Sequence, residues 1–168
     1  MIENISFDEL VSLIRRNYDR DVLITFHSIG DRDAVGSAVA LSEYMPHSTV
    51  AMPDFLTNNA RKMLASVNYD KKITAKFVHA STVIVTDADN TSVLGPFSKE
   101  LLAYTGDVLF IDHHLRTEDL KTELPNAASV YVFSDETFNS TCSVVYAVLE
   151  RLNYRVSKEV ATLLVNGM

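Results

Sequence analysis

The stretch His27-Ser28-Ile29-Gly30-Asp31-Arg32-Asp33-Ala34-Val35-Gly36-Ser37 lies between an apolar run at 22–26 and a helix-like pattern that begins near Ala34. It predicts a strand that ends at a histidine, followed by a short loop that carries two carboxylates. We expect Asp33 at or near the helix cap, where an acid accepts hydrogen bonds from unpaired N–H groups. One imidazole and two carboxylates at the end of a strand suit a divalent cation. The alternative is purely structural, with turn and cap residues beside a hydrogen-bonded histidine.

The same pattern recurs twice downstream. A β-branched run at 83–86 leads into Asp87, and a second apolar run at 108–111 leads into Asp112-His113-His114. The carboxyl ends of parallel strands meet at one edge of a sheet. We therefore expect these acids and histidines to gather at one edge.

Apolar runs and amphipathic patterns alternate along the chain, which predicts an α/β fold. We expect a single domain over 1–168, with a doubly wound, mainly parallel five-stranded sheet and helices on both faces. The predicted strands are 22–27, 48–52, 82–87, 107–112 and 129–133. The predicted helices cover 34–45, 56–67, 96–104, 141–152 and 157–165, after an N-terminal helix opened by the capping box Ser6-Phe7-Asp8-Glu9. The stretches 68–79 and 113–126 are predicted to be mostly loop, the second wrapping the edge of the site.

The three motifs together resemble the DHH phosphoesterase family over roughly residues 22 to 168. The motifs are His-x-x-x-Asp-x-Asp-Ala-x-Gly-Ser, a middle strand that ends in Asp, and Ile-Asp-His-His. The resemblance implies two divalent ions, usually manganese, with magnesium or cobalt as substitutes. It also implies hydrolysis of phosphodiesters or phosphoanhydrides.

Carried over residue by residue, the resemblance implies five metal ligands: His27, Asp31, Asp33, Asp87 and His113. Of these, Asp87 would bridge the two ions. Two further residues take catalytic roles. His114 would face the substrate phosphate or the leaving group. Asp112 would orient a neighbouring imidazole or touch a metal.

The chain departs from the family pattern in three places. Gly30 replaces a common proline, which we expect to make the loop more flexible, and Arg32 replaces a common glycine, where it would pair with Asp31 or reach a phosphate. The family normally continues past a Leu-Leu-x-x-Gly-(Ile/Met) helix end with a further aspartate and a substrate-binding domain. This chain stops at that helix end, so we expect a fragment or truncated product that holds the second ion weakly.

The amino-acid composition of the chain limits the classes of molecule that it can bind. The net charge of −7 argues against a long duplex, whereas a small nucleotide or a short single-stranded oligonucleotide fits better. The sequence contains neither a signal peptide nor an apolar run of the roughly 20 residues that would span a bilayer, so we expect a cytoplasmic protein without a membrane partner. Its single cysteine, Cys142, excludes an internal disulfide and is expected in the core. The sequence leaves open whether the chain forms a homodimer.

The predicted function is hydrolysis of phosphodiester bonds in short oligonucleotides or small nucleotides through a metal-bridged water, which includes exonuclease activity. The alternatives are a manganese-dependent pyrophosphatase or polyphosphatase of the same fold, and a catalytically weak binding fragment. An aspartyl-phosphate phosphatase is a rival because of Asp31-Arg32-Asp33, although its nucleophile usually follows the strand directly. A receiver-like switch domain would need a lysine after the last strand, where this chain has Phe133-Ser134.

Overall fold

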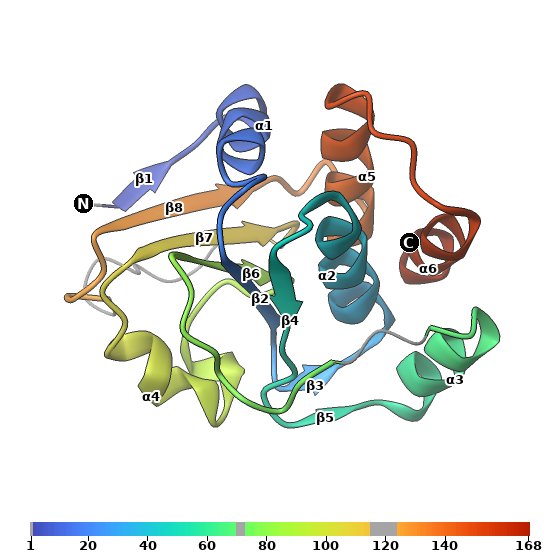
Figure 1. Cartoon of the computed structure of the whole chain (residues 1–168), viewed down its shortest axis with the longest axis horizontal. Helices are drawn as coiled ribbons and strands as arrows, with labels where there is room; N and C mark the ends of the chain where they lie inside the picture. Colours follow the sequence, from blue (N-terminus) through green and yellow to red (C-terminus); the bar gives the residue numbers. More distant parts are fainter. Residues whose placement is uncertain (1, 70–72, 115–123) are drawn as a thin grey trace.

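The computed structural model describes residues 2–69, 73–114 and 124–168 and shows a six-stranded parallel sheet (Figure 1). The strand order is β1-β8-β7-β6-β2-β4. The strands are β1 (Ile2–Asn4), β2 (Val22–Phe26), β4 (Ser48–Val50), β6 (Thr82–Thr86), β7 (Asp107–Asp112) and β8 (Ser129–Ser134). The predicted doubly wound α/β architecture is confirmed.

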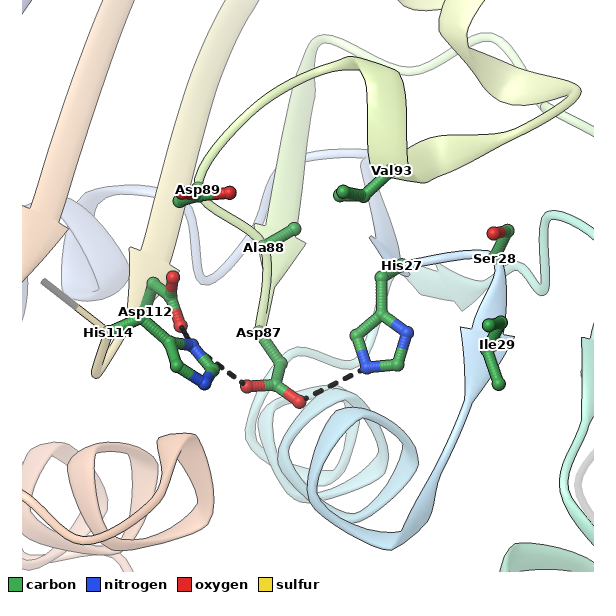
Figure 2. Close-up of a pocket in the computed structure, with 9 residues that line it drawn as sticks. All are labelled: His27, Ser28, Ile29, Asp87, Ala88, Asp89, Val93, Asp112 and His114. Carbon is green, nitrogen blue, oxygen red and sulfur yellow. Dashed lines mark hydrogen bonds and ion pairs between the residues drawn. The ribbon is translucent and has the colours of Figure 1, made fainter. Parts of the chain in front are cut away.

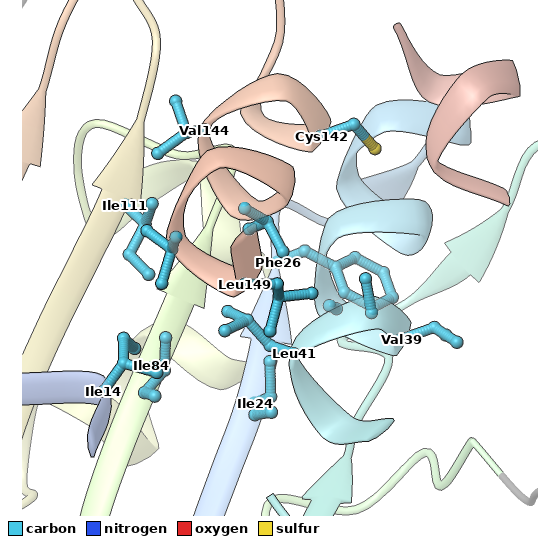
Figure 3. Packing of buried hydrophobic residues seen from close by; sticks show 14 of the residues in the cluster. Ile14, Ile24, Phe26, Val39, Leu41, Ile84, Ile111, Cys142, Val144 and Leu149 are labelled. Carbon is cyan, nitrogen blue, oxygen red and sulfur yellow. The ribbon is translucent and has the colours of Figure 1, made fainter. Parts of the chain in front are cut away.

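Helices cover both faces of this sheet. The helices are α1 (Phe7–Arg16), α2 (Arg32–Tyr44), α3 (Asn58–Ser66), α4 (Phe97–Leu102), α5 (Thr141–Arg151) and α6 (Lys158–Gly167), with a 3-10 turn η1 (Ser92–Leu94). Alternate strand residues face opposite cores, as the two-residue period of a strand requires. Ile24 and Phe26 pack with α1, α2 and α5 on one face of the sheet (Figure 3). Leu23 packs with α4 and η1 on the other face. Parallel strands buried on both faces explain the continuous apolar runs.

The predicted strand count of five was wrong, because β1 adds a sixth strand at the sheet edge. Its three residues pair in parallel with β8, and Ile2 lies opposite Val130. A strand of three residues with two polar ones shows no measurable period, which is why the sequence pattern missed it. The capping box of α1 is confirmed, since the Ser6 side chain accepts from the Glu9 N–H and the Glu9 carboxylate accepts from the Ser6 N–H.

The start of α2 differs from the prediction. Asp31, not Asp33, is the N-cap, and its Oδ1 accepts hydrogen bonds from the N–H groups of Asp33 (3.0 Å) and Ala34 (3.1 Å). Because Asp31 already satisfies these N–H groups, the Asp33 side chain is free to point elsewhere. Cys142 is buried in the core as predicted.

The loop between β2 and α2 contains a short strand that the sequence did not predict. β3 (Ile29–Gly30) pairs in parallel with β5 (Phe55–Leu56), apart from the main sheet. A Cβ added at Gly30 would lie 2.7 Å from both Leu56 Cδ2 and Phe26 Cε2. A larger residue at position 30 would therefore have to displace the Leu56 or Phe26 side chain, and the predicted effect of Gly30 on loop flexibility stays a prediction.

Within the described residues, no helix is long and apolar enough to cross a membrane. Most of the stretch predicted to wrap the site edge, 115–123, lies outside the described residues, as do 70–72 in the other predicted loop.

Candidate metal centre

The structure brings all seven predicted site residues to the carboxyl edge of the sheet. His27 directly follows β2, Asp87 directly follows β6, and Asp112 is the last residue of β7 (Figure 2). Among the residues that the structure describes, potential ligand atoms form two groups, each within 4.8 Å, and both groups contain Asp87. The first group is His27, Asp31 and Asp87; the second is Asp87, Asp112, His113 and His114. The arrangement fits the predicted role of Asp87 between two ions, whereas the individual roles stay predictions.

Asp87 is buried and faces both groups with one carboxylate. Its Oδ2 lies 3.3 Å from His27 Nε2, and its Oδ1 lies 4.0 Å from His114 Nδ1 (Figure 2). The same Oδ1 lies 3.8 Å from His113 Nε2. Its backbone has a φ of 58°, in the left-handed region that few residues other than glycine adopt. The Asp87 N–H donates to the Ile111 carbonyl at 2.9 Å, which holds this conformation. Such backbone outliers are found most often at functional sites.

Asp33 is held by the first turn of α5. Its Oδ2 accepts from the Thr141 N–H at 2.8 Å, and its Oδ1 accepts from the Cys142 N–H at 2.6 Å. His113 Nε2 lies 3.7 Å from Asp33 Oδ2, which connects Asp33 with the second group. The free N–H groups at a helix start favour a negative charge, so the hydrogen bonds from α5 hold the Asp33 carboxyl in place beside the site and partly oppose the rise in its pKa that burial and Asp87 cause.

Thr141 is a site residue that the motifs did not reveal. It is fully buried, its N–H donates to Asp33, and its hydroxyl donates to Asp87 Oδ1 at 3.0 Å. A polar residue at a helix start usually reads as a cap, and here Ser140 is the cap. The available signal was topological, because a helix that follows a parallel strand begins at the same edge as the other motifs.

Thr141→Val should weaken manganese binding about tenfold, because groups that orient metal ligands typically contribute 10- to 100-fold to affinity. Valine preserves the shape and the backbone N–H but removes the hydroxyl. Thr141→Ser should retain the affinity, and Thr162→Val, which removes a helical hydroxyl on α6, is the control. Isothermal titration calorimetry measures all three, and unchanged affinity in Thr141→Val would exclude this role.

The two histidines after β7 point to different surroundings. The Asp112 Oδ1 accepts from the His113 N–H and from His114 Nδ1, both at 2.8 Å. The His113 side chain is 19% exposed and lies near Asp33 and Asp87, whereas that of His114 is 59% exposed and lines the pocket beside the site. This difference agrees with His113 as a ligand and His114 as a group that faces the substrate.

Asp112 provides the test of whether the site suits a cation. Its second carboxylate oxygen, Oδ2, is buried and has no hydrogen-bond partner among the described residues. A buried acceptor without a partner is rare in folded proteins and commonly marks an ion or a water. The donor set of carboxylate oxygens and imidazole nitrogens suits manganese, and carboxylate oxygens also suit magnesium. The residues present therefore fit a divalent cation.

The pKa shifts of the site residues also agree with a site for a divalent cation. Burial alone would lower the pKa of His27, but the hydrogen bond and charge of Asp87 outweigh it and raise that pKa. The pKa of His114 is raised in the same manner by Asp112, against the effect of burial. Burial and the charge of Asp87 raise the pKa of Asp33. Burial also opposes ionisation of Asp87, but His27 prevails and lowers its pKa. The carboxylates thus favour positive charge at this site, which a bound metal ion would also supply.

Residues 21–168 match the sequence model of the family described as "DHH family, N-terminal domain". The chain belongs to the DHH family. Asp112-His113-His114 is its Asp-His-His motif. Members of this family are metal-dependent phosphoesterases, and this DHH chain carries the fold together with a candidate Asp/His metal site.

The DHH chain is similar to several longer proteins. It is 27% identical over 165 residues to an uncharacterised protein of Methanocaldococcus jannaschii, covering 95% of this chain and 47% of that protein. The chain therefore spans about half the length of the curated relative it matches. An exopolyphosphatase-related protein from Bacteroides fragilis superposes with a TM-score of 0.74 at 22% identity, over 96% of this chain and 48% of that one. A candidate family II inorganic pyrophosphatase of Methanococcus jannaschii superposes with a TM-score of 0.61 at 16% identity. This superposition covers 87% of this chain and 47% of that protein. Both superpositions show the fold alone.

Arg32, the second departure from the DHH pattern, is exposed at the start of α2. The described residues show no ion pair between Arg32 and Asp31, so the predicted pairing of the two is not present. The ion pair of Asp31 is with His27, whose Nε2 lies 3.9 Å from Asp31 Oδ1. The same Asp31 oxygen that caps α2 thus also lies near the metal centre.

The raised histidine pKa values predict opposite pH trends with and without metal. A folded-state pKa above the unfolded value stabilises the chain below about pH 6.5, and this contribution is lost as the pH rises through the folded pKa. The melting temperature in EDTA should therefore fall from pH 6 to pH 8. The rise caused by manganese should grow over the same interval, because fewer protons compete with the ion for the proposed ligand His27. Thermal scans at both pH values test this, and a larger manganese effect at pH 6 would contradict it.

Proposed function

We propose that this chain is the metal-binding part of a manganese-dependent phosphoesterase that hydrolyses phosphodiester bonds in small nucleotides or short single-stranded oligonucleotides. The observation that carries the proposal is the buried carboxylate of Asp87, which faces two groups of imidazoles and carboxylates at once. A carboxylate shared by two groups of ligands supports a site for two ions, which in phosphoesterases stabilise the attacking and leaving oxygens. His27, Asp31 and Asp87 would hold one ion, and Asp33, Asp87 and His113 the other.

When bound, such ions neutralise phosphate oxygens and lower the pKa of water, which provides a nucleophile at neutral pH. The chain's own residues supply orientation and proton transfer. Asp112 Oδ1 fixes the His114 ring through Nδ1, which leaves Nε2 for the substrate. An imidazole held this way at the open side of the site suits proton donation to a leaving oxygen. Asp112 thus acts through His114, and His114 acts on substrate.

A phosphoanhydride is the second candidate substrate. The two superposed structures are described as exopolyphosphatase-related and as a candidate inorganic pyrophosphatase. A binding fragment with little activity is the third interpretation. Self-association as a homodimer stays a prediction.

The test compares substrates on the protein as its gene encodes it, after chelation and reloading with manganese. We expect release of nucleoside monophosphate from a dinucleotide at least tenfold faster than release of phosphate from pyrophosphate, with Asp87→Asn as the inactive control. Faster cleavage of pyrophosphate would favour the phosphoanhydride reaction. Bound manganese without hydrolysis of either compound would favour the binding fragment.

A further inference from the structure

An apolar pair of side chains lies next to the metal centre, on the ladder between β3 and β5. Ile29 is in register with Phe55, and Gly30 is in register with Leu56. Residues in register share a face of the ladder, and successive residues alternate between faces. Ile29 and Phe55 are therefore neighbours on one face.

The two faces of this ladder have opposite surroundings. Gly30 is buried and Leu56 packs against the core, so that face is anchored to the domain. On the other face, Ile29 is 54% exposed and Phe55 is 43% exposed. Backbone hydrogen bonds from Phe55 N–H to the Ser28 carbonyl and from Thr57 N–H to the Gly30 carbonyl hold the ladder in place. The chain thus presents a fixed apolar surface to the outside, which we call the Ile29–Phe55 platform.

This platform continues the wall of the pocket at the metal centre. The pocket has a volume of about 460 Å³, and Ile29 lines it together with His27 and Asp87 (Figure 2). Ala88 and Val93 add further apolar surface on the wall. The volume falls in the range of small-molecule sites. The pocket therefore combines a polar end at Asp87 with an apolar flank at Ile29.

We propose that the Ile29–Phe55 platform binds the base of a nucleotide whose phosphate lies at the metal centre. This inference rests on the proposed function and names the part of the substrate that the platform recognises. A nucleobase has flat apolar faces that stack on an aromatic ring in a sequence-tolerant way. Pyrophosphate and polyphosphate have no apolar surface to bury against Ile29 and Phe55. The platform thus selects a nucleotide ester over an inorganic phosphoanhydride.

The test uses two ligands that differ only in the base, AMP and ribose 5-phosphate, titrated calorimetrically into the manganese-loaded chain. AMP should bind about tenfold more tightly than ribose 5-phosphate, as expected for one stacked base. Phe55→Ala should remove this difference while the affinity for ribose 5-phosphate is retained, which also shows that the variant is folded. Leu102→Ala on α4 removes an apolar side chain of similar exposure (39%) and should leave the difference intact.

A second variant reports contact directly. The chain has no tryptophan, so Phe55→Trp introduces a single tryptophan on the platform, whose emission can be excited selectively. AMP should quench its fluorescence and ribose 5-phosphate should not, whereas Leu102→Trp should respond to neither ligand.

The outcomes separate this inference from the proposed function. Equal affinity for AMP and ribose 5-phosphate in the parent chain, or unchanged AMP affinity in Phe55→Ala, overturns the platform and leaves the phosphate site standing. A change of oligomeric state in Phe55→Ala, with AMP affinity unaltered, reassigns the pair to a protein contact and also overturns it. Binding of neither ligand in the presence of manganese overturns the proposed function, and the platform with it.

Discussion

Asp87→Asn is expected to abolish most of the thermal stabilisation that manganese gives to this chain. At an ion concentration 100 times the Kd, selective binding to the folded state stabilises it by about 2.7 kcal/mol. For a domain of this size, that free energy corresponds to a rise in melting temperature of about 5–10 °C. In Asp87→Asn the rise should stay below about 2 °C, because the one carboxylate shared by both groups of ligands is lost. Differential scanning calorimetry with and without manganese measures both values.

The choice of asparagine separates charge from backbone conformation. Asparagine tolerates the positive φ of residue 87, whereas alanine would add strain there. Asp107→Asn is the matched control, because it removes a carboxylate at the opposite end of the neighbouring strand β7. It should respond to manganese as the parent does. If Asp87→Asn also responds like the parent, Asp87 is not a ligand.

His114→Ala should lower the turnover of the gene-encoded protein about 100-fold or more while manganese affinity changes less than about threefold. Proton transfer by a positioned imidazole contributes about 10²- to 10⁴-fold to a rate. The histidine that lies near Asp33 and Asp87 is His113, which remains in this variant. Steady-state kinetics at saturating manganese, together with calorimetric titration of the ion, provide the two quantities.

His113→Ala is the matched partner for this experiment, because it removes the neighbouring imidazole. It should lose manganese affinity first, and turnover as a consequence. The reverse pattern, with metal lost in His114→Ala and turnover per bound metal preserved, would mean that the two histidines have exchanged roles.

The strand ends were predictable from the sequence for a simple reason. Short, continuous apolar runs rich in β-branched residues are typical of central parallel strands, and such strands bring their last residues to one edge. His27, Asp87 and Asp112 each follow or end such a run, so their convergence required no knowledge of side-chain conformation. The start of α2 was less predictable, because Asp31 and Asp33 are both suited to cap the helix and only tertiary contacts with α5 distinguish them.

The sequence patterns could not predict very short strands or hydrogen-bond donors that are distant in sequence from their acceptors. β1, β3 and β5 contain two or three residues each, too few to show a period. Thr141 is 54 residues from Asp87, and its hydroxyl reaches that carboxylate only because α5 starts beside β6 at the same sheet edge. The exposed platform on β3 and β5 follows from the same ladder that the patterns missed.

Anomalous X-ray scattering can show directly whether a divalent cation binds at Asp87. Crystals of the chain grown with manganese should show an anomalous peak in contact with the Asp87 carboxylate and with an imidazole from His27 or His113. A manganese peak elsewhere, with none at Asp87 at saturating ion concentration, would contradict the account.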